Sequence, residues 1–310
     1  ESSGPADNPS CEKIAALGPE DYWLKTIGGG AGRRLVIAGG SPLATLYGAY
    51  AFIEKLGVRF SLDGDVIPDE RIEFRIPDLD DAAHPLFALR GIQPFHDFAE
   101  GPDWWNEDDY KMILGQLPKL RMNFFGLHTY PENNPNAEPG VWIGLPGEFA
   151  PDGRVTAAYP SSWQNTLRSN SWSHNWGYQP KPTSRFSFGA AGFFDRDDYG
   201  PEVMAGLMPE PRRPGDSVEL FNRAADMLRR AFVFGRNIGV KICVGTETPL
   251  TVPAEVRERL KRAGKDFRDP AVIKELYKGV FGRIRASYPI DYYWLWTNEN
   301  WTWSDASEKD

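Results

Sequence analysis

Polar side chains that could do chemistry follow four short apolar stretches of this chain. We predict strands over residues 87–92, 122–127, 240–244 and 292–296. These strands carry or lead to polar groups, in the order Arg90, His96 and Asp97, then His128, then Glu247, then Asn298 and Glu299. Because the carboxyl ends of neighbouring parallel strands meet at one edge of a sheet, we expect these groups to share one site.

Carboxylates that converge with arginine, histidine and tryptophan suit the cleavage of glycosidic bonds. One carboxylic acid must protonate the leaving oxygen, and a second group must attack or stabilise an oxocarbenium-like centre. Glu299 is the predicted general acid, because the tryptophans at 294, 296, 301 and 303 would raise the pKa of its carboxyl group. The predicted substrate contacts are Arg90, His96, Asp97, His128, Glu247, Asn298, Trp301 and Trp303.

These residues also have purely structural interpretations. Glu299 fits a solvated loop carboxylate, and Arg90 fits an ion pair with an acidic neighbour. His128 fits a hydrogen-bonded core histidine, and Glu247 fits a helix-capping acid. Tryptophan rings stack on the flat faces of sugars, but they also fill protein cores. Both interpretations therefore stay open at this point.

Composition excludes several classes of partner. The 310 residues include 35 Lys and Arg against 43 Asp and Glu, for a net charge of -8 with no basic stripe, so we expect no nucleic-acid partner. No apolar run approaches the roughly 20 residues of a membrane-spanning helix. The sequence has no H-E-x-x-H, G-x-S-x-G, P-loop or G-x-G-x-x-G motif, so we expect neither a metal nor a cofactor. Cys11 and Cys243 support neither a disulfide framework nor a four-ligand zinc site.

A small α/β accessory domain is predicted over residues 34–80, after an N-terminal segment at 1–33. A strand at 34–38 leads to Ser41, a helix N-cap, and to Pro42 at the first helical position. The helix should run to Leu56, with Gly57 as its C-terminal cap. We predict two further strands at 58–60 and 71–76, the second from its alternation of charged and apolar residues, and then a linker at 78–85.

Residues 86–310 alternate short strands with longer helices, which predicts a parallel sheet with right-handed crossovers. The predicted helices cover residues 107–117, 218–237, 253–263 and 270–287. An open doubly wound sheet or a (β/α)8 barrel would fit, and the absence of a Gly-rich dinucleotide turn favours the barrel. A stretch rich in Pro, Gly, Asn and Ser at 130–216, after the second strand, is predicted to be a long substrate-site loop, with disorder as the alternative.

Parts of the chain resemble known glycosidases. Residues 34–68, with Leu-Val-Ile-Ala-Gly-Gly and Leu-Gly-Val-Arg-Phe, resemble the accessory domain before the barrel of family 20 β-N-acetylhexosaminidases and of α-glucuronidases. Residues 89–92 and 122–128 resemble the first two barrel strands of family 20 enzymes. The resemblance implies that Arg90 holds sugar hydroxyls, that His128 lines the sugar pocket, and that Glu299 is the general acid.

One position departs from family 20. Those enzymes carry an Asp before the acid, which orients the acetamido group of the substrate, and this chain has Asn298. Substrate-assisted cleavage is therefore disfavoured. An Asn-Glu pair resembles instead the acid/base motif of retaining barrel glycosidases, whose nucleophile follows strand seven. A uronate paired with Arg90 keeps the α-glucuronidase class open.

The expectation is an α/β chain that joins an accessory domain to about four βα units of a (β/α)8 barrel. A barrel of ~250 residues does not fit into the part that remains, so we expect a truncated glycoside hydrolase, inactive alone, whose missing C-terminal sequence completes the barrel. Its substrate would be an oligo- or polysaccharide with O-glycosidic bonds. The alternatives are a non-catalytic carbohydrate-binding protein on the same scaffold, and a half-barrel completed by another chain.

Overall fold

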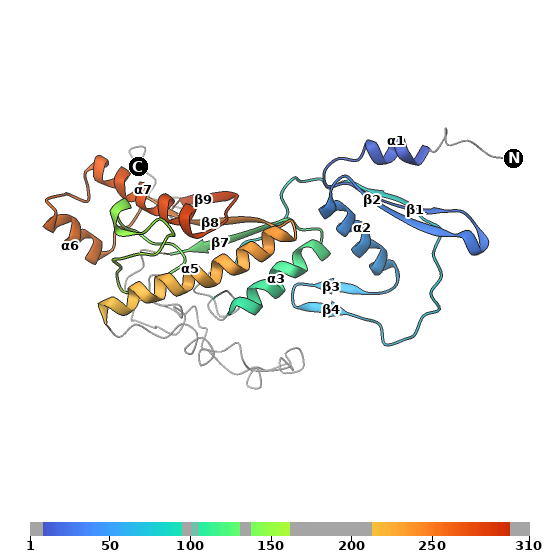
Figure 1. Ribbon diagram of the computed structural model, residues 1–310, viewed down its shortest axis with the longest axis horizontal. Coiled ribbons are helices and arrows are strands. Elements are labelled where there is room, and N and C mark those ends of the chain that lie inside the picture. Colours follow the sequence, from blue (N-terminus) through green and yellow to red (C-terminus); the bar gives the residue numbers. More distant parts are fainter. Residues whose placement is uncertain (1–8, 95–101, 103–104, 131–137, 162–212, 298–310) are drawn as a thin grey trace. The chain divides into compact units, whose positions relative to one another are not determined.

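The computed structural model describes residues 9–94, 102, 105–130, 138–161 and 213–297 (Figure 1). The chain divides into two compact units: unit 1 comprises residues 1–91, 112–124 and 237–240, and unit 2 comprises the remainder. The elements up to residue 92 are α1 (Pro9–Ala15), β1 (Tyr22–Ile27), β2 (Arg34–Gly39), α2 (Pro42–Lys55), β3 (Arg59–Ser61), β4 (Gly64–Val66), β5 (Asp80–Ala83) and β6 (Gly91–Ile92). They are followed by α3 (Glu107–Lys119), β7 (Phe124–Thr129), α5 (Pro214–Asn237), β8 (Lys241–Thr248), α6 (Ala254–Arg262), α7 (Pro270–Ser287) and β9 (Tyr292–Thr297).

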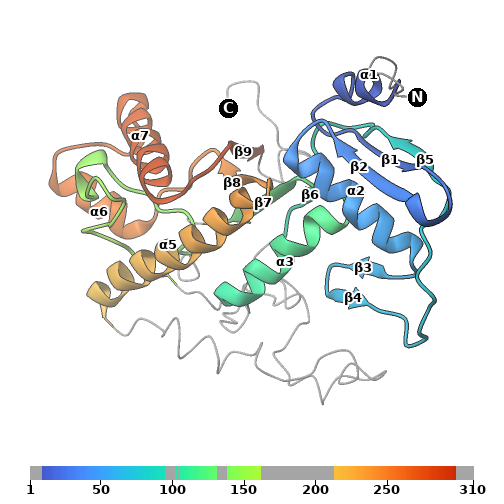
Figure 2. The same ribbon diagram turned by 45° about the vertical axis from the view of Figure 1, so that its right-hand side comes forward.

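Unit 1 is built on an antiparallel sheet in the order β2-β1-β5, with α2 packed on it (Figure 2). The start of α2 is fixed as predicted, because the Ser41 hydroxyl accepts a hydrogen bond from the Ala44 N–H at 3.1 Å. Leu24, Ala51 and Leu79 form the core between the helix and the sheet. At Gly48 a methyl group would lie 2.8 Å from Ile37 Cγ2, so glycine allows the close approach of α2 to β2.

Three local predictions for unit 1 need correction. Residues 71–76 form no strand, because their alternating pattern finds no partner strand among the described residues. The predicted linker at 78–85 contains β5, which pairs with β1 and whose polar composition concealed it. β1 lies within residues 1–33, which were predicted to be a separate N-terminal segment, and its six residues pair with β2 in full register.

Most of the strands and helices that the alternating pattern predicts lie in unit 2, although α3 is shared with unit 1 and the strand predicted at 87–92 is reduced to Gly91–Ile92. The four-stranded sheet has the order β6-β7-β8-β9, and β8 and β9 are parallel. The helices predicted at 107–117, 218–237, 253–263 and 270–287 are present as α3, α5, α6 and α7, with ends shifted by a few residues at most. Asp269 caps α7 by accepting from the Ala271 N–H at 2.8 Å, and Pro270 occupies its first turn. The prediction of a mixed α/β fold is therefore confirmed.

Helices α5 and α7 pack on one face of the β7–β9 sheet. The Phe125 ring on β7 lies 6.3 Å from the Phe232 ring on α5. The Tyr293 ring on β9 lies 4.7 Å from the Phe281 ring on α7. Since successive side chains of a strand point to opposite faces, His128 and the tryptophans of β9 point to the other face. Of the predicted site residues of unit 2, the two that the structure describes, His128 and Glu247, lie on that second face.

Candidate functional site

The candidate site lies on the face of β7–β9 opposite to α5 and α7, and it is called the strand face below. Its residues are His128 of β7, Cys243, Gly245 and Glu247 of β8, and Trp294 and Trp296 of β9. Register in the parallel pair sets Gly245 beside Trp294 and Glu247 beside Trp296. The sheet therefore brings together two predicted contacts, His128 and Glu247, from strands more than a hundred residues apart.

His128 is the most enclosed polar group of the strand face, with 1% of its surface exposed. Its ring centre lies 4.8 Å from the Tyr130 ring and 6.0 Å from the Trp296 ring, and it meets Trp296 edge to face at 77°. An imidazole among aromatic rings at a strand end can donate to or accept from a ligand hydroxyl. Core packing and a pocket role are both compatible with this burial.

Trp294 and Trp296 form a stacked pair on β9. Their ring centres are 5.4 Å apart and their planes differ by 10°. Both side chains are half-buried. The Thr248 hydroxyl at the end of β8 donates to the Trp296 carbonyl at 3.2 Å, which joins the carboxyl ends of the two strands. The pair offers the flat apolar surface and indole N–H groups that suit a sugar ring.

Gly245 makes room for this pair. A methyl group at Gly245 would lie 2.4 Å from Trp294 Cβ and 2.5 Å from its carbonyl oxygen. Both neighbours are close to the backbone of β9, so a small shift of a side-chain tip could not relieve the contact. Sequence reasoning did not select Gly245, Trp294 or Trp296 as site residues. The period of two between the tryptophans within a predicted strand was the signal that could have selected those two.

Glu247 is half-buried and supplies the carboxylate of the strand face. Its register places it beside Trp296, with polar Thr248 following it at the strand end. A carboxylate next to an aromatic surface is a frequent arrangement for holding sugar hydroxyls, because the oxygens accept while the ring covers the C–H face. In the described part of the chain, no group of three or more His, Cys, Asp or Glu side chains is placed to hold a metal ion.

Cys243 lies on the strand face, but its thiol is unreactive. Its side chain is 2% exposed, and burial raises the pKa of its thiol to about 11. The thiolate is the nucleophilic form of cysteine, so this residue stays in its unreactive form near neutral pH. Both cysteines are free thiols in the structure.

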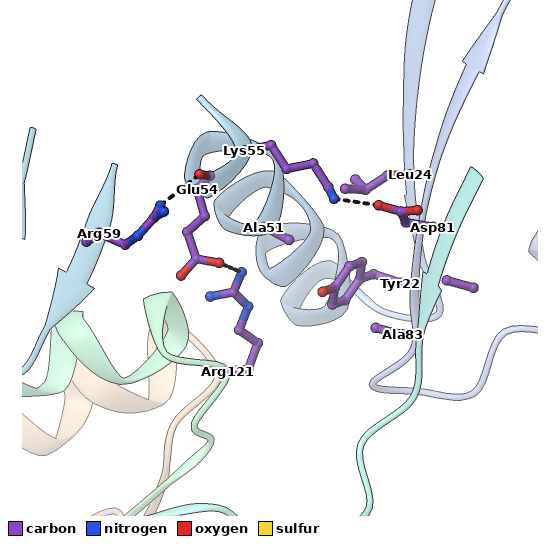
Figure 3. Close-up of a pocket in the computed structure, with 10 residues that line it drawn as sticks. Tyr22, Leu24, Ala51, Glu54, Lys55, Arg59, Asp81, Ala83 and Arg121 are labelled. Atoms are coloured by element: carbon purple, nitrogen blue, oxygen red, sulfur yellow. Dashed lines mark hydrogen bonds and ion pairs between the residues drawn. The ribbon is translucent and has the colours of Figure 1, made fainter. Parts of the chain in front are cut away.

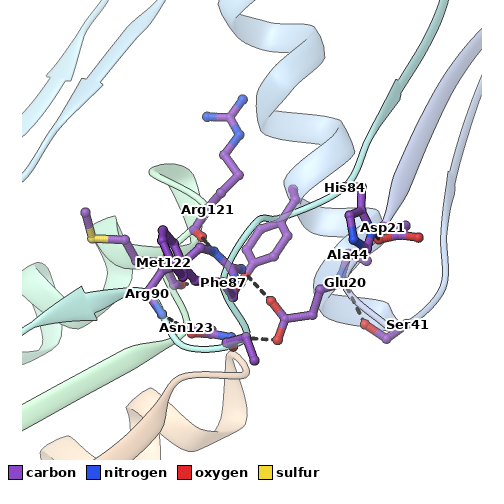
Figure 4. Close-up of polar contacts among 12 residues, drawn as sticks. Glu20, Asp21, Ser41, Ala44, His84, Phe87, Arg90, Arg121, Met122 and Asn123 are labelled. Atoms are coloured by element: carbon purple, nitrogen blue, oxygen red, sulfur yellow. Dashed lines mark hydrogen bonds and ion pairs between the residues drawn. The ribbon is translucent and has the colours of Figure 1, made fainter. Parts of the chain in front are cut away.

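Arg90 lies in unit 1, where it joins several backbone segments (Figure 4). Its guanidinium forms a salt bridge with Glu20 and donates to the Arg121 carbonyl at 2.9 Å and to the Phe87 carbonyl at 2.5 Å. Asn123 adds a bond to Glu20 at 2.6 Å and accepts from the Arg90 N–H at 2.9 Å. These contacts give Arg90 a structural role in unit 1, and its predicted contact with a sugar stays a prediction.

The remaining predicted site residues fall outside the described residues. They are His96, Asp97, Asn298, Glu299, Trp301 and Trp303. Most of the predicted loop at 130–216 also lies outside them. The predictions for these positions, including the general acid, therefore stay predictions.

Unit 1 contains a hollow of about 480 Å³ (Figure 3). Two ion pairs line it, Lys55 with Asp81 at 2.5 Å and Arg121 with Glu54 at 2.5 Å. Arg59 donates to the Glu54 carbonyl at 3.0 Å. No predicted site residue lines this hollow, and its cations are occupied by carboxylates or carbonyls of unit 1, so we interpret it as a structural cleft.

Comparison with known proteins adds one similar structure to this mixed α/β fold. No protein-family model matches the chain. No curated protein matches it either. Among solved structures, the chain is similar to one described as a GH138 enzyme targeting pectin rhamnogalacturonan II, with a TM-score of 0.45 and 12% sequence identity. The alignment covers 94% of this chain and 25% of that protein, so this chain spans about a quarter of its length.

None of the described helices combines the length and the apolar character that crossing a membrane requires. The longest, α5, carries charged residues such as Glu219, Arg223 and Arg230 along its length.

Proposed function

We propose that this chain is part of a carbohydrate-active glycoside hydrolase whose sugar site is the strand face. The observation that carries the proposal is the stacked Trp294–Trp296 pair beside His128 and Glu247 at the carboxyl ends of β7–β9. An aromatic surface with convergent polar groups at that edge of a parallel sheet is the usual composition of a sugar-binding site in an α/β enzyme.

In this proposal the accessory domain predicted at 34–80 also includes β1 and the whole of β5, and residues 86–310 form about four βα units of a (β/α)8 barrel. The parallel β8–β9 pair and the alternation with α5, α6 and α7 support the barrel. The described residues 138–161 contact α5, α6 and α7, for example through the Val155 N–H, which donates to Asn222 at 2.8 Å, so only the remainder of the predicted loop at 130–216 would supply a substrate loop. The resemblance of the N-terminal residues to family 20 hexosaminidases and α-glucuronidases supports a glycosidase over other barrel enzymes.

The proposed chemistry is acid/base cleavage of an O-glycosidic bond. Glu299 would protonate the leaving oxygen, since it follows β9 by two residues in the sequence, and nearby tryptophans would keep its carboxyl group protonated. His128, Glu247 and Asn298 would hold sugar hydroxyls, with His96 and Asp97 after the first strand. Trp301 and Trp303 would extend the aromatic surface of Trp296.

The test is steady-state hydrolysis of a panel of aryl glycosides and oligosaccharides by the full-length protein. Glu299→Gln should lower kcat by at least about a hundredfold, as expected for removal of a general acid. Glu258→Gln, an exposed position on α6, is the matched control and should leave kcat unchanged. Unchanged turnover in Glu299→Gln would refute the assignment of the acid.

A non-catalytic carbohydrate-binding protein on the same scaffold is the second candidate. The stacked tryptophans favour it as much as an enzyme, because stacking contributes to binding without any catalytic group. This candidate predicts that oligosaccharides bind and that none of the panel is cleaved. Hydrolysis that depends on Glu299 would exclude it.

A further inference from the structure

Residues 71–76 of unit 1 are an open segment with the sequence Arg-Ile-Glu-Phe-Arg-Ile. Ile72 is 55% exposed and Phe74 is 61% exposed. No backbone hydrogen bond joins this segment to any other described residue. An exposed stretch with free N–H and C=O groups and alternating apolar side chains is a template for pairing with another strand.

We propose that the 71–76 segment pairs antiparallel with the same segment of a second copy of this chain. The order of the charged residues indicates that the partner is a second copy of the same segment. In the register centred on Phe74, Glu73 of each copy lies opposite Arg75 of the other. Opposite charges directly across an antiparallel pair stabilise it. The same register sets Ile72 opposite Ile76 and Phe74 opposite its own copy, so the apolar side chains also meet.

The two registers centred on the residues next to Phe74 are disfavoured by the same charges. A pairing centred on Glu73 would set Arg71 opposite Arg75 twice and Glu73 opposite Glu73. A pairing centred on Arg75 would bring two arginines face to face. Like charges directly opposite each other destabilise a strand pair. Among the registers centred on residues 73, 74 and 75, the charges therefore select the one centred on Phe74.

Contacts within unit 1 leave these groups available for a second copy. Glu73 and Arg75 pair with each other at 2.9 Å, with 76% and 79% of their side chains exposed. This ion pair shows that both side chains lie on the same side of the segment. In the dimer it would be replaced by two Glu73–Arg75 ion pairs between the copies. Phe74 meets Phe52 of α2 edge to face at 6.4 Å, so part of its ring is supported while most of it is exposed.

Cysteine cross-linking of the full chain tests the register. In a Cys11→Ser background, which removes the exposed thiol and leaves buried Cys243, Phe74→Cys should form a disulfide-linked dimer under mild oxidation. Opposite Cβ atoms in an antiparallel pair are about 4.5–5.5 Å apart. Ile72→Cys alone should not cross-link, because its copy lies roughly 13 Å away at about 3.3 Å per residue. A mixture of Ile72→Cys and Ile76→Cys chains should cross-link.

Charge reversal tests the partner in solution. Sedimentation equilibrium should show a reversible dimer whose dissociation constant rises at least about tenfold in Glu73→Arg or Arg75→Glu. The double variant Glu73→Arg/Arg75→Glu should dimerise as the wild type does, because the pairs are restored with opposite polarity. A chain that stays monomeric up to about 100 µM overturns the proposal. A dimer that is indifferent to the single reversals, or that cross-links at 72 as readily as at 74, also overturns it.

Discussion

Glu247 on β8 and Trp296 on β9 occupy the same register position in a parallel pair of strands. A carboxylate and an indole are thereby held side by side at the carboxyl ends of the two strands. His128 on β7 reaches the same indole from the other side of β8, with ring centres 6.0 Å apart. The sheet, rather than a loop, fixes the spacing of these three groups, and rigid elements position a binding site more accurately than loops do.

Gly245→Ala tests whether β8 must lack a side chain beside Trp294. The added methyl group would lie 2.4 Å from Trp294 Cβ, so β9 must shift. We expect the free energy of unfolding to fall by about 1–3 kcal/mol, as in other overpacked sites. Gly29→Ala is the control, since nothing lies within 4 Å of its added methyl group and its φ is -148°. Denaturant unfolding monitored by tryptophan fluorescence measures the stability of both variants. A Gly245→Ala variant as stable as the Gly29→Ala control would contradict the role of Gly245.

The two cysteines should differ sharply in reactivity. Cys11 is exposed, whereas burial raises the pKa of Cys243 to about 11, so roughly one Cys243 thiol in a thousand is ionised at pH 8. Iodoacetamide added to the folded chain should alkylate Cys11 and leave Cys243 unmodified until a denaturant is added. Peptide mass spectrometry reads both sites in one sample. Equal labelling of the two thiols in the folded chain would show that Cys243 is accessible.

Asp80 of β5 should make the stability of unit 1 depend on pH. Hydrogen bonds from Lys25, Trp23 and Lys13 hold the pKa of its carboxyl group well below the usual range. A lowered pKa in the folded state gives stability that is present above the unfolded-state value of about 3.9 and is lost as the pH falls below it.

Asp80→Asn should therefore lower Tm at pH 7 and have a smaller effect at about pH 2, where the Asp80 carboxyl of the unfolded chain is protonated. Thermal unfolding monitored by circular dichroism at the two pH values measures the difference. The Trp23 indole N–H, which donates to Asp80 at 2.7 Å, reports on the same contact through its fluorescence. An equal loss of Tm at both pH values would assign the effect to packing instead of charge.

The parts of the fold that local signals determine could be predicted from the sequence. Ser41 and Asp269 cap their helices as their positions before proline indicate. β5 could not be predicted, because it contains two aspartates and two alanines and owes its strand conformation to pairing with β1. Residues 71–76 show the reverse case, since a strand-like alternation cannot by itself supply a neighbour.

The candidate site could likewise be predicted only in part from the sequence. Polar residues that follow a strand, such as Glu247 at the end of β8, can be predicted from the sequence, because their position depends only on where the strand ends. The contact of His128 with Trp296 depends on the order β7-β8-β9, which is a long-range property of the chain. Arg90 looked like a site residue from its place in a predicted strand, and its partner Glu20 is distant in sequence and could not be foreseen.

Oligosaccharide binding by Trp296→Ala measures the central claim most directly. The strand face is a sugar site in this account, so isothermal titration of the full chain with an oligosaccharide panel should give at least a tenfold weaker Kd for this variant, or about 1.4 kcal/mol. Leu295→Ala is the matched control, because Leu295 is the next residue of β9, is 56% exposed and points to the opposite face. It should bind like the wild type. Equal affinity of Trp296→Ala and the wild type, or no binding of any oligosaccharide to the wild type, would contradict the account.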